Sequence, residues 1–146
     1  MRVRDVMATD ILRVSPGLSW REAARLFLAH RVSAAPVVDS AGALVGILSE
    51  KDLFRGLFPS YAEWMAAPHA FRDFEEMERP DVSEKTASEV MARRLITASP
   101  DTPVLKVGAL MAASGIHHVP VVEGTKVIGM VNRGSIYRAI LQTYFL

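Results

Sequence analysis

The start of one helix carries the residue types in this sequence that best suit chemistry. Ser49-Glu50-Lys51-Asp52 directly follows the apolar run Gly46-Ile47-Leu48. The N-terminus of a helix offers unpaired backbone N–H groups that suit a phosphate, and an acidic side chain such as Asp52 can accept hydrogen bonds from both hydroxyls of a ribose. The same S-x-x-D spacing is an ordinary helix capping box. The spacing alone favours the cap, but one carboxylate can serve either purpose.

A second helix start, later in the chain, lacks this acid. The segment Asn132-Arg133-Gly134-Ser135 occupies the equivalent place in an internal repeat. Asn is a good N-cap residue, so the helix start is kept although the carboxylate is not. If Asp52 binds a ribose, the equivalent site at Ser135 is impaired, and the sequence therefore predicts one good site per chain.

No catalytic constellation accompanies these segments. The sequence contains no G-x-S-x-G, H-E-x-x-H or Walker motif. It contains no cysteine, which excludes disulfides, thiolate zinc sites and cysteine nucleophiles. Among the four histidines only His117 and His118 are neighbours, and adjacent residues on a strand point to opposite faces. We therefore expect neither an enzyme nor a metal site.

Composition and charge narrow the classes further. Half of the 146 residues are hydrophobic and the net charge is +1, which is typical of an ordinary globular protein. This charge gives no reason to expect nucleic acid or an anionic membrane as a partner. No apolar run approaches the roughly 20 residues needed to span a bilayer, and the N-terminus lacks the apolar region of a signal peptide. We expect a cytoplasmic protein.

The two helix starts belong to an internal repeat, which is the clearest signal in the sequence. Three motifs of the first half recur 84 residues later, and a fourth recurs after a single deletion in the preceding turn. The pairs are Asp5-Val6-Met7-Ala8 with Glu89-Val90-Met91-Ala92, Ser15-Pro16 with Ser99-Pro100, Pro36-Val37-Val38-Asp39 with Pro120-Val121-Val122-Glu123, and Val45-Gly46-Ile47-Leu48 with Ile128-Gly129-Met130-Val131. Four matches in one order indicate two copies of one structural unit.

Each copy predicts the order strand, helix, strand, strand, helix, an α/β (α+β) unit. The expected strands are residues 11–14, 35–38 and 45–48 in the first copy, and 95–98, 119–122 and 128–131 in the second. Ser19 and Glu22 form a capping box for the first helix. Thr102 is expected to cap the equivalent helix, with Pro103 at its first position. One copy is too small for a good core, so we expect the two to pack sheet to sheet.

The repeat divides the chain into a first domain of residues 1–57, a linker of residues 58–85 and a second domain of residues 86–146. The linker is longer than most connections. It carries large apolar side chains, at Tyr61, Trp64, Met65, Phe71, Phe74 and Met77. Because such side chains are normally covered, we expect one or two short helices packed on the core or on a partner chain. A mere spacer is the alternative.

The repeated pattern resembles the CBS-domain family, whose domains occur in tandem as a Bateman module. The D-V-M opening, the S-P step, the P-V-V strand and the G-h-h-S-x-x-D helix start follow one another in this order. They recur in the second copy with Glu89 for Asp5, Asn132 for Ser49 and Ser135 for the final acid. The resemblance covers about residues 2–57 and 86–144, which leaves only the linker outside it. It implies a pseudo-symmetric pair of domains with two clefts, in which nucleotides with an adenosine moiety commonly bind.

The resemblance also implies roles for individual residues of the two clefts. In that family the ribose-binding acid comes from one domain and the adenine pocket largely from the other. In one cleft, therefore, Asp52 would hold the ribose and Ser49 would lie near ribose or phosphate. The residues that would enclose the adenine are Leu95, Ile96 and Ile116. His117 and His118 would lie near phosphate, or would be packed or hydrogen-bonded strand residues.

The other cleft is expected to bind more weakly, because Ser135 stands where the family has the acid. Its remaining residues would be Met7, Asp10, Leu12, Val32 and Ser33. Arg133 could compensate there by contacting phosphate.

As a whole, the resemblance implies a non-enzymatic regulatory module that senses an adenosine-containing nucleotide such as AMP, ADP, ATP or a relative. It implies no required cofactor, and an output that passes to an unidentified effector protein. Such modules usually dimerise, and the last helix carries an apolar stripe that one small unit does not fully cover, so we expect a homodimer. The stripe consists of Ile136, Tyr137, Ile140, Leu141 and Tyr144. A structural or protein-interaction module with clefts that bind nothing is the alternative.

Overall fold

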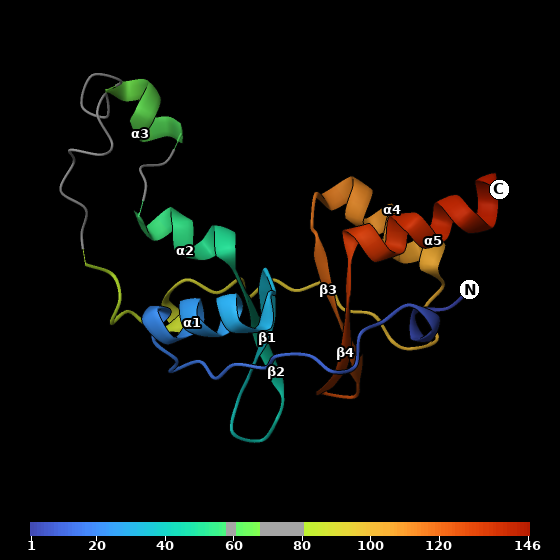
Figure 1. Ribbon diagram of the computed structural model, residues 1–146, viewed down its shortest axis with the longest axis horizontal. Coiled ribbons are helices and arrows are strands. Elements are labelled where there is room, and N and C mark those ends of the chain that lie inside the picture. Colours follow the sequence, from blue (N-terminus) through green and yellow to red (C-terminus); the bar gives the residue numbers. More distant parts are fainter. Residues whose placement is uncertain (58–60, 68–80) are drawn as a thin grey trace.

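The fold repeats one arrangement of elements in its two halves (Figure 1). The computed structural model describes residues 1–57, 61–67 and 81–146. The first half contains η1 (Val3–Asp5), α1 (Trp20–His30), β1 (Ala34–Val38), β2 (Leu44–Ser49) and α2 (Glu50–Leu57). After α3 (Tyr61–Ala66), the second half contains η3 (Ala87–Glu89), α4 (Val104–Ser114), β3 (His118–Glu123), β4 (Lys126–Asn132) and α5 (Arg133–Phe145). The predicted helix, strand, strand, helix order is confirmed in both halves.

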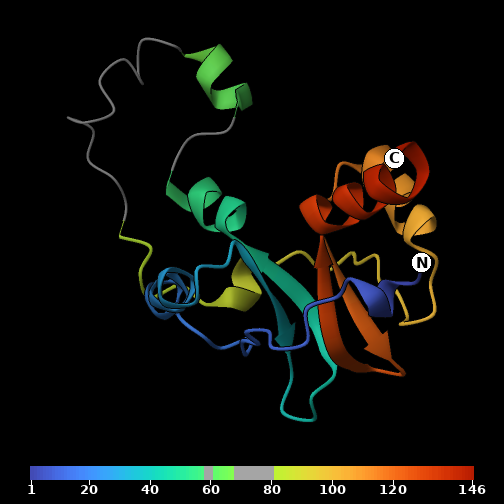
Figure 2. The same ribbon diagram turned by 45° about the vertical axis from the view of Figure 1, so that its right-hand side comes forward.

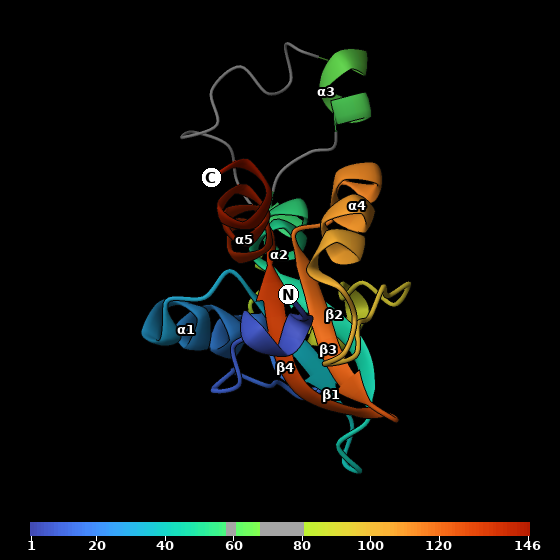
Figure 3. The ribbon, with the colours of Figure 1, turned by 90° about the vertical axis from the view of Figure 1, so that its right-hand side faces the viewer.

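Each half is built on an antiparallel hairpin, β1–β2 in the first and β3–β4 in the second. Both hairpins have a register shift at the equivalent place, between Val37 and Val38 and between Val121 and Val122. The hairpins lie one behind the other in Figure 3, and the Leu44 backbone N–H donates to the carbonyl of Thr125 across them at 3.1 Å. The prediction that the halves pack sheet to sheet is confirmed.

The first predicted strand of each half is shorter than expected. Residues 11–14 and 95–98 each form a single parallel bridge, Val14 with Val37 and Ala98 with Val121. The reason is Pro36 in β1 and Pro120 in β3, which have no N–H to donate and so cannot continue the parallel pairing toward residues 12 and 96. At the other end Ser15-Pro16 turns the chain, and the Leu18 N–H donates to the Ser15 carbonyl at 3.2 Å. An extended segment therefore ends where the Ser-Pro turn begins.

The two long N-terminal helices begin differently although they are equivalent in the repeat. Ser19 caps α1, since its hydroxyl accepts from the Glu22 backbone N–H at 3.1 Å, as predicted. The expected cap at Thr102 is wrong. Its hydroxyl instead accepts from the Ser99 backbone N–H at 2.9 Å and so stabilises the Ser-Pro turn, while Pro103 is the N-cap residue of α4 and makes no side-chain hydrogen bond.

The opening segment of each half pairs with the hairpin of the other half (Figure 2). Ala8 and Met130 exchange two backbone hydrogen bonds of 2.9 and 3.0 Å. Ala92 and Ile47 exchange two equivalent bonds of 2.8 and 3.0 Å. Residues near the N-terminus therefore extend the second hairpin, and residues 86–92 extend the first.

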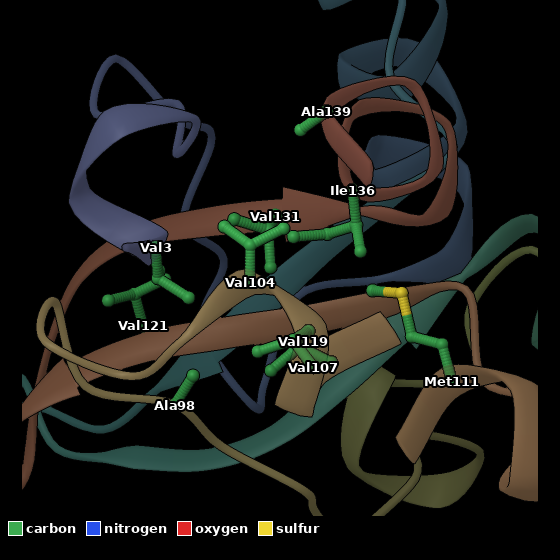
Figure 4. Packing of buried hydrophobic residues seen from close by; sticks show 10 residues of the cluster. All are labelled: Val3, Ala98, Val104, Val107, Met111, Val119, Val121, Val131, Ile136 and Ala139. Atoms are coloured by element: carbon green, nitrogen blue, oxygen red, sulfur yellow. The ribbon is translucent and has the colours of Figure 1, made fainter. Parts of the chain in front are cut away.

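The hydrophobic cores follow the same exchange. Val3 is fully buried in the core of the second half, among residues of β3, β4, α4 and α5 (Figure 4). Ala87 and Met91 are buried in the core of the first half, beside α1 and the β1–β2 hairpin. Burying a side chain such as Val3 contributes about 1.5–3 kcal/mol, so each predicted domain range supplies stability to the other. The domain boundaries themselves stay a prediction.

Glycine is required where the opening segments cross the hairpins. A Cβ atom at Gly129 would lie 2.7 Å from the Ala8 carbonyl oxygen, and one at Gly46 would lie 3.0 Å from the Ala92 carbonyl oxygen. A side chain at either position would push the crossing backbone away, so the G-h-h part of the repeated motif has a packing reason.

The linker is described in part. A short helix, α3, is present as predicted, and the Met65 side chain on it is 59% exposed and so does not pack on the core. Phe71, Phe74 and Met77 lie outside the described residues.

Candidate ligand-binding clefts

A cleft of about 420 Å³ lies between the two halves. Its lining comes from Ser33 and the β2–α2 junction of the first half, and from residues 92, 94–96 and 115–118 of the second. All residues that the sequence analysis assigned to the main site lie in this lining, namely Ser49, Asp52, Leu95, Ile96, Ile116, His117 and His118. We refer to it as the larger cleft; the ligand-binding role of these residues stays a prediction.

Asp52 is a buried carboxylate at the first turn of α2, with 5% of the residue exposed. Its Oδ2 atom accepts hydrogen bonds from the Ser49 backbone N–H at 2.8 Å and from the Ser49 hydroxyl at 2.9 Å. Its Oδ1 atom accepts from Nη1 of Arg55 at 3.1 Å. The helix-cap interpretation of S-x-x-D is therefore confirmed, and Arg55 is a further partner.

His117 is half-buried and contacts Arg133, the first residue of α5, in two ways. Its carbonyl accepts from the Arg133 backbone N–H at 2.8 Å, and its Nε2 lies 3.1 Å from Nη1 of Arg133. Because a guanidinium can only donate, Nε2 accepts and the ring proton is on Nδ1. Burial, followed by the charges of Arg133 and Lys51, lowers the pKa of His117 below its ordinary value.

His118 is also half-buried, and its Nε2 lies 3.1 Å from the Ser33 hydroxyl. Burial, and then the neighbouring His117, lower the pKa of His118. The lowered pKa values favour the neutral form of both histidines, and each has one ring nitrogen in a hydrogen bond.

Three cationic side chains of the larger cleft, Lys51, Arg55 and Arg94, were not predicted from the sequence. Arg55 follows Asp52 by three residues on a helix, a spacing that places both on one face. That spacing is a signal that could have found it, whereas nothing in the sequence marks Arg94. Within the part of the chain that the structure describes, Lys51 and Arg94 form no ion pair. Both charges are therefore available to an anion.

A smaller cleft of about 230 Å³ lies on the other side of the interface. Four residues of the predicted second site line it, namely Asp10, Leu12, Val32 and Ser33. Met7 and Ser135 lie outside this lining. Met7 packs beside Gly129 and against the second core, and the Ser135 backbone N–H donates to the Asn132 side chain at 2.9 Å in the first turn of α5.

Arg31 contributes an unusual backbone to the smaller cleft. It ends α1 in the left-handed conformation with φ of 55°, whereas the equivalent residue at the end of α4 and in the larger cleft is Gly115, with φ of 72°. A left-handed residue other than glycine costs on the order of 1 kcal/mol. The two clefts thus differ at a helix end as well as at the Asp52 position.

A family model for the CBS domain matches the chain twice, at residues 3–58 and 87–142. The chain belongs to the CBS-domain family. The uncharacterized protein MJ1426 of Methanocaldococcus jannaschii is 31% identical over 97% of this chain and 92% of that protein. L-aspartate semialdehyde sulfurtransferase from the same organism is 29% identical over 93% of this chain, which spans only 22% of that enzyme's length.

A solved CBS-domain pair has the same fold. The crystal structure of the CBS domain pair of protein MJ0100 superimposes with a TM-score of 0.72 at 29% identity, over 96% of this chain and 95% of that one. The MJ0100 pair was crystallised in complex with 5′-methylthioadenosine and S-adenosyl-L-methionine.

The two clefts of this CBS-domain pair share part of their lining. Ser33 and His118, which are hydrogen-bonded to each other, line both. The same pair of side chains therefore forms the wall between the larger and the smaller cleft.

The described residues of this CBS-domain pair contain no cluster of three or more His, Cys, Asp or Glu side chains suited to a metal ion. No helix among those residues is long and apolar enough to cross a membrane.

Proposed function

We propose that this CBS-domain pair is a non-enzymatic regulatory module that binds an adenosine-containing nucleotide in the larger cleft. The observation that carries the proposal is the meeting of residues from both halves around the Asp52 carboxylate. The cleft volume of about 420 Å³ falls in the range of small-molecule sites. The MJ0100 pair, crystallised with two adenosine derivatives, supports the same ligand class.

The proposed ligand lies with its ribose at the first turn of α2. Asp52 accepts hydrogen bonds from the ribose hydroxyls, and Ser49 lies beside it. Leu95, Ile96 and Ile116 are half-buried and provide an apolar surface for the adenine ring.

The phosphate end of the ligand lies toward the cations of the cleft. Lys51 and Arg94 line it without ion pairs among the described residues, and the neutral His117 and His118 offer polar ring atoms. A phosphate raises the pKa of a nearby histidine, so an anionic ligand draws a proton into the cleft as the pH falls.

The output of the module passes through its surface, and we propose a homodimer that contacts an effector protein. In the apolar stripe of α5, Ile136 is buried and Ile140 packs against the core of its own half. Tyr137, Leu141 and Tyr144 are 37%, 53% and 55% exposed. These three side chains remain for a second copy of the chain.

A structural or protein-interaction module is the second candidate, and one observation favours it. Both oxygens of Asp52 already have partners, Ser49 and Arg55, so the carboxylate has a complete role as a helix cap. In this case the larger cleft binds no nucleotide.

Isothermal titration calorimetry of the purified protein separates the candidates. The ligands are AMP, ATP, 5′-methylthioadenosine and S-adenosylmethionine, and the sensor proposal expects binding of at least one of them at one site per chain. Asp52→Asn keeps the size of the side chain but removes its charge, so affinity falls about 10- to 100-fold, as for loss of a charged hydrogen bond.

Ser135→Ala is the matched control, because Ser135 occupies the equivalent place in the repeat and lies outside both linings. Its affinity is expected to equal that of the wild type. Absence of binding by all four ligands would favour the structural module instead. Loss of binding in Ser135→Ala with normal binding in Asp52→Asn would place the site elsewhere.

A further inference from the structure

We propose that Arg55 makes the larger cleft selective for phosphorylated nucleotides over the corresponding nucleosides. This inference rests on the proposed function, since it concerns how the same cleft distinguishes two adenosine ligands. It is carried by the position of Arg55, which lines the cleft and is hydrogen-bonded to the carboxylate proposed to hold the ribose.

Arg55 occupies the part of Asp52 that a ribose needs. Oδ2 already accepts two hydrogen bonds from Ser49, at 2.8 and 2.9 Å, which keep α2 capped. Oδ1 is the oxygen left for a ligand, and Nη1 of Arg55 lies 3.1 Å from it. Only 7% of the Asp52 side chain is exposed, so we infer that a ribose that reaches Oδ1 competes with Arg55 for this oxygen.

The Arg55 side chain can change rotamer, and the group that it contacts afterwards depends on the ligand. Its own side chain is 71% exposed, so few contacts oppose a change of rotamer. The other charged residues of the cleft lining are Lys51, Arg94 and Glu50 at the first position of α2. A guanidinium displaced by adenosine has lost the charge of Asp52, whereas one displaced by AMP gains a phosphate in the same cleft.

The ion pair between Arg55 and Asp52 therefore opposes the binding of adenosine and AMP equally. Only AMP compensates for the lost ion pair, because its phosphate offers Arg55 a new partner. Asp52 is buried, but Arg55 is exposed to solvent, which weakens the pair, so its loss changes an equilibrium constant by about fivefold or less. A charged hydrogen bond to phosphate contributes about tenfold or more. Replacing Arg55 therefore removes the same opposing effect for both ligands, and removes the favourable phosphate contact for AMP alone.

Calorimetric titration with AMP and with adenosine tests this inference, because the two ligands differ only in the phosphate. In Arg55→Gln the affinity for adenosine is expected to rise by up to about fivefold. The ratio of AMP affinity to adenosine affinity is expected to fall by about tenfold or more, and the affinity for AMP itself falls by about twofold or more, because the lost phosphate contact outweighs the removed ion pair. In Arg55→Lys the preference for AMP is partly restored, since the ammonium group keeps the charge but not the planar geometry.

Arg25→Gln is the matched control. Arg25 pairs with Glu22 across the same i,i+3 spacing and the same 3.1 Å, but on α1 and outside both cleft linings. Neither affinity is expected to change in this variant. Melting curves from circular dichroism confirm that each variant is folded before titration.

The outcomes separate this inference from the proposed function. If the wild type binds none of adenosine, AMP, ATP, 5′-methylthioadenosine and S-adenosylmethionine, the proposed function fails. If it binds only those ligands that carry no phosphate, the selectivity inference is overturned while the function stands. If the wild type binds and Arg55→Gln lowers both affinities by the same factor, Arg55 only positions Asp52, and the selectivity inference is overturned while the function stands. Unchanged affinities for both ligands overturn it as well.

Discussion

Replacing Gly129 by alanine tests whether the exchanged opening segments hold the two halves together. The new Cβ would lie 2.7 Å from the carbonyl oxygen of Ala8 and 3.1 Å from Sδ of Met7. The methionine can change rotamer, but the carbonyl is backbone. Ordinary contact begins at 3.4 Å, so the Ala8 segment must withdraw by more than half an ångström, roughly the scale at which packing contacts are lost.

The magnitude follows from what this withdrawal disturbs. Ala8 exchanges hydrogen bonds of 2.9 and 3.0 Å with Met130, which is the residue next to the substitution. Overpacking of this kind costs about 1–3 kcal/mol, and weakening one of the two hydrogen bonds adds about 1 kcal/mol. We therefore expect Gly129→Ala to lower the free energy of unfolding by about 2–4 kcal/mol.

Urea unfolding, followed by the fluorescence of the buried Trp20, measures this change. Gly17→Ala is the control, because no atom lies within 4 Å of a Cβ at that position and its φ is not in the left-handed range. It should leave stability unchanged or raise it by up to about 1 kcal/mol. If the two variants unfold at the same urea concentration, the close crossing of Ala8 over Gly129 has no energetic role and the reasoning is refuted.

Two further predictions concern protonation and assembly. Because burial lowers the pKa of His118, the folded state binds fewer protons than the unfolded state when the pH is below the ordinary histidine pKa, so stability falls as the pH decreases from 7.5 to 5.5. The melting temperature of His118→Gln should fall less over this range than that of the wild type. An equal dependence of melting temperature on pH in both proteins would contradict the lowered pKa of His118. Leu141→Glu places a charge in the exposed part of the α5 stripe, so sedimentation velocity should show a monomer where the wild type sediments as a dimer, and a monomeric wild type would exclude the homodimer.

The sequence predicted those parts of the fold that local patterns determine. The β1–β2 and β3–β4 hairpins and the Ser19 cap depend on neighbours in the chain, and for the hairpins the repeat offered the same pattern twice. The exchange of opening segments was not predictable in this way. The apolar residues Val3 and Met91 show that their segments are buried, but a pattern does not say against which hairpin.

The candidate site divides in a similar way. The larger cleft contains every residue that the resemblance assigned to it, because the motif positions have fixed places in the fold. Arg55 and Arg94 of the larger cleft were not predicted, because Arg55 belongs to no motif and nothing in the sequence marks Arg94. Met7 and Ser135 lie outside the smaller cleft because packing and a helix turn engage them, which a motif alone does not reveal.

The hydrogen-bonded pair of Ser33 and His118 belongs to the lining of both clefts, so a change in this pair alters both linings. If the proposed function holds and a ligand in one cleft takes Nε2 of His118 as its partner, that nitrogen leaves Ser33 and the lining of the other cleft changes with it. Since such linkage is reciprocal, we then expect occupancy of the smaller cleft to alter the apparent affinity of the larger one.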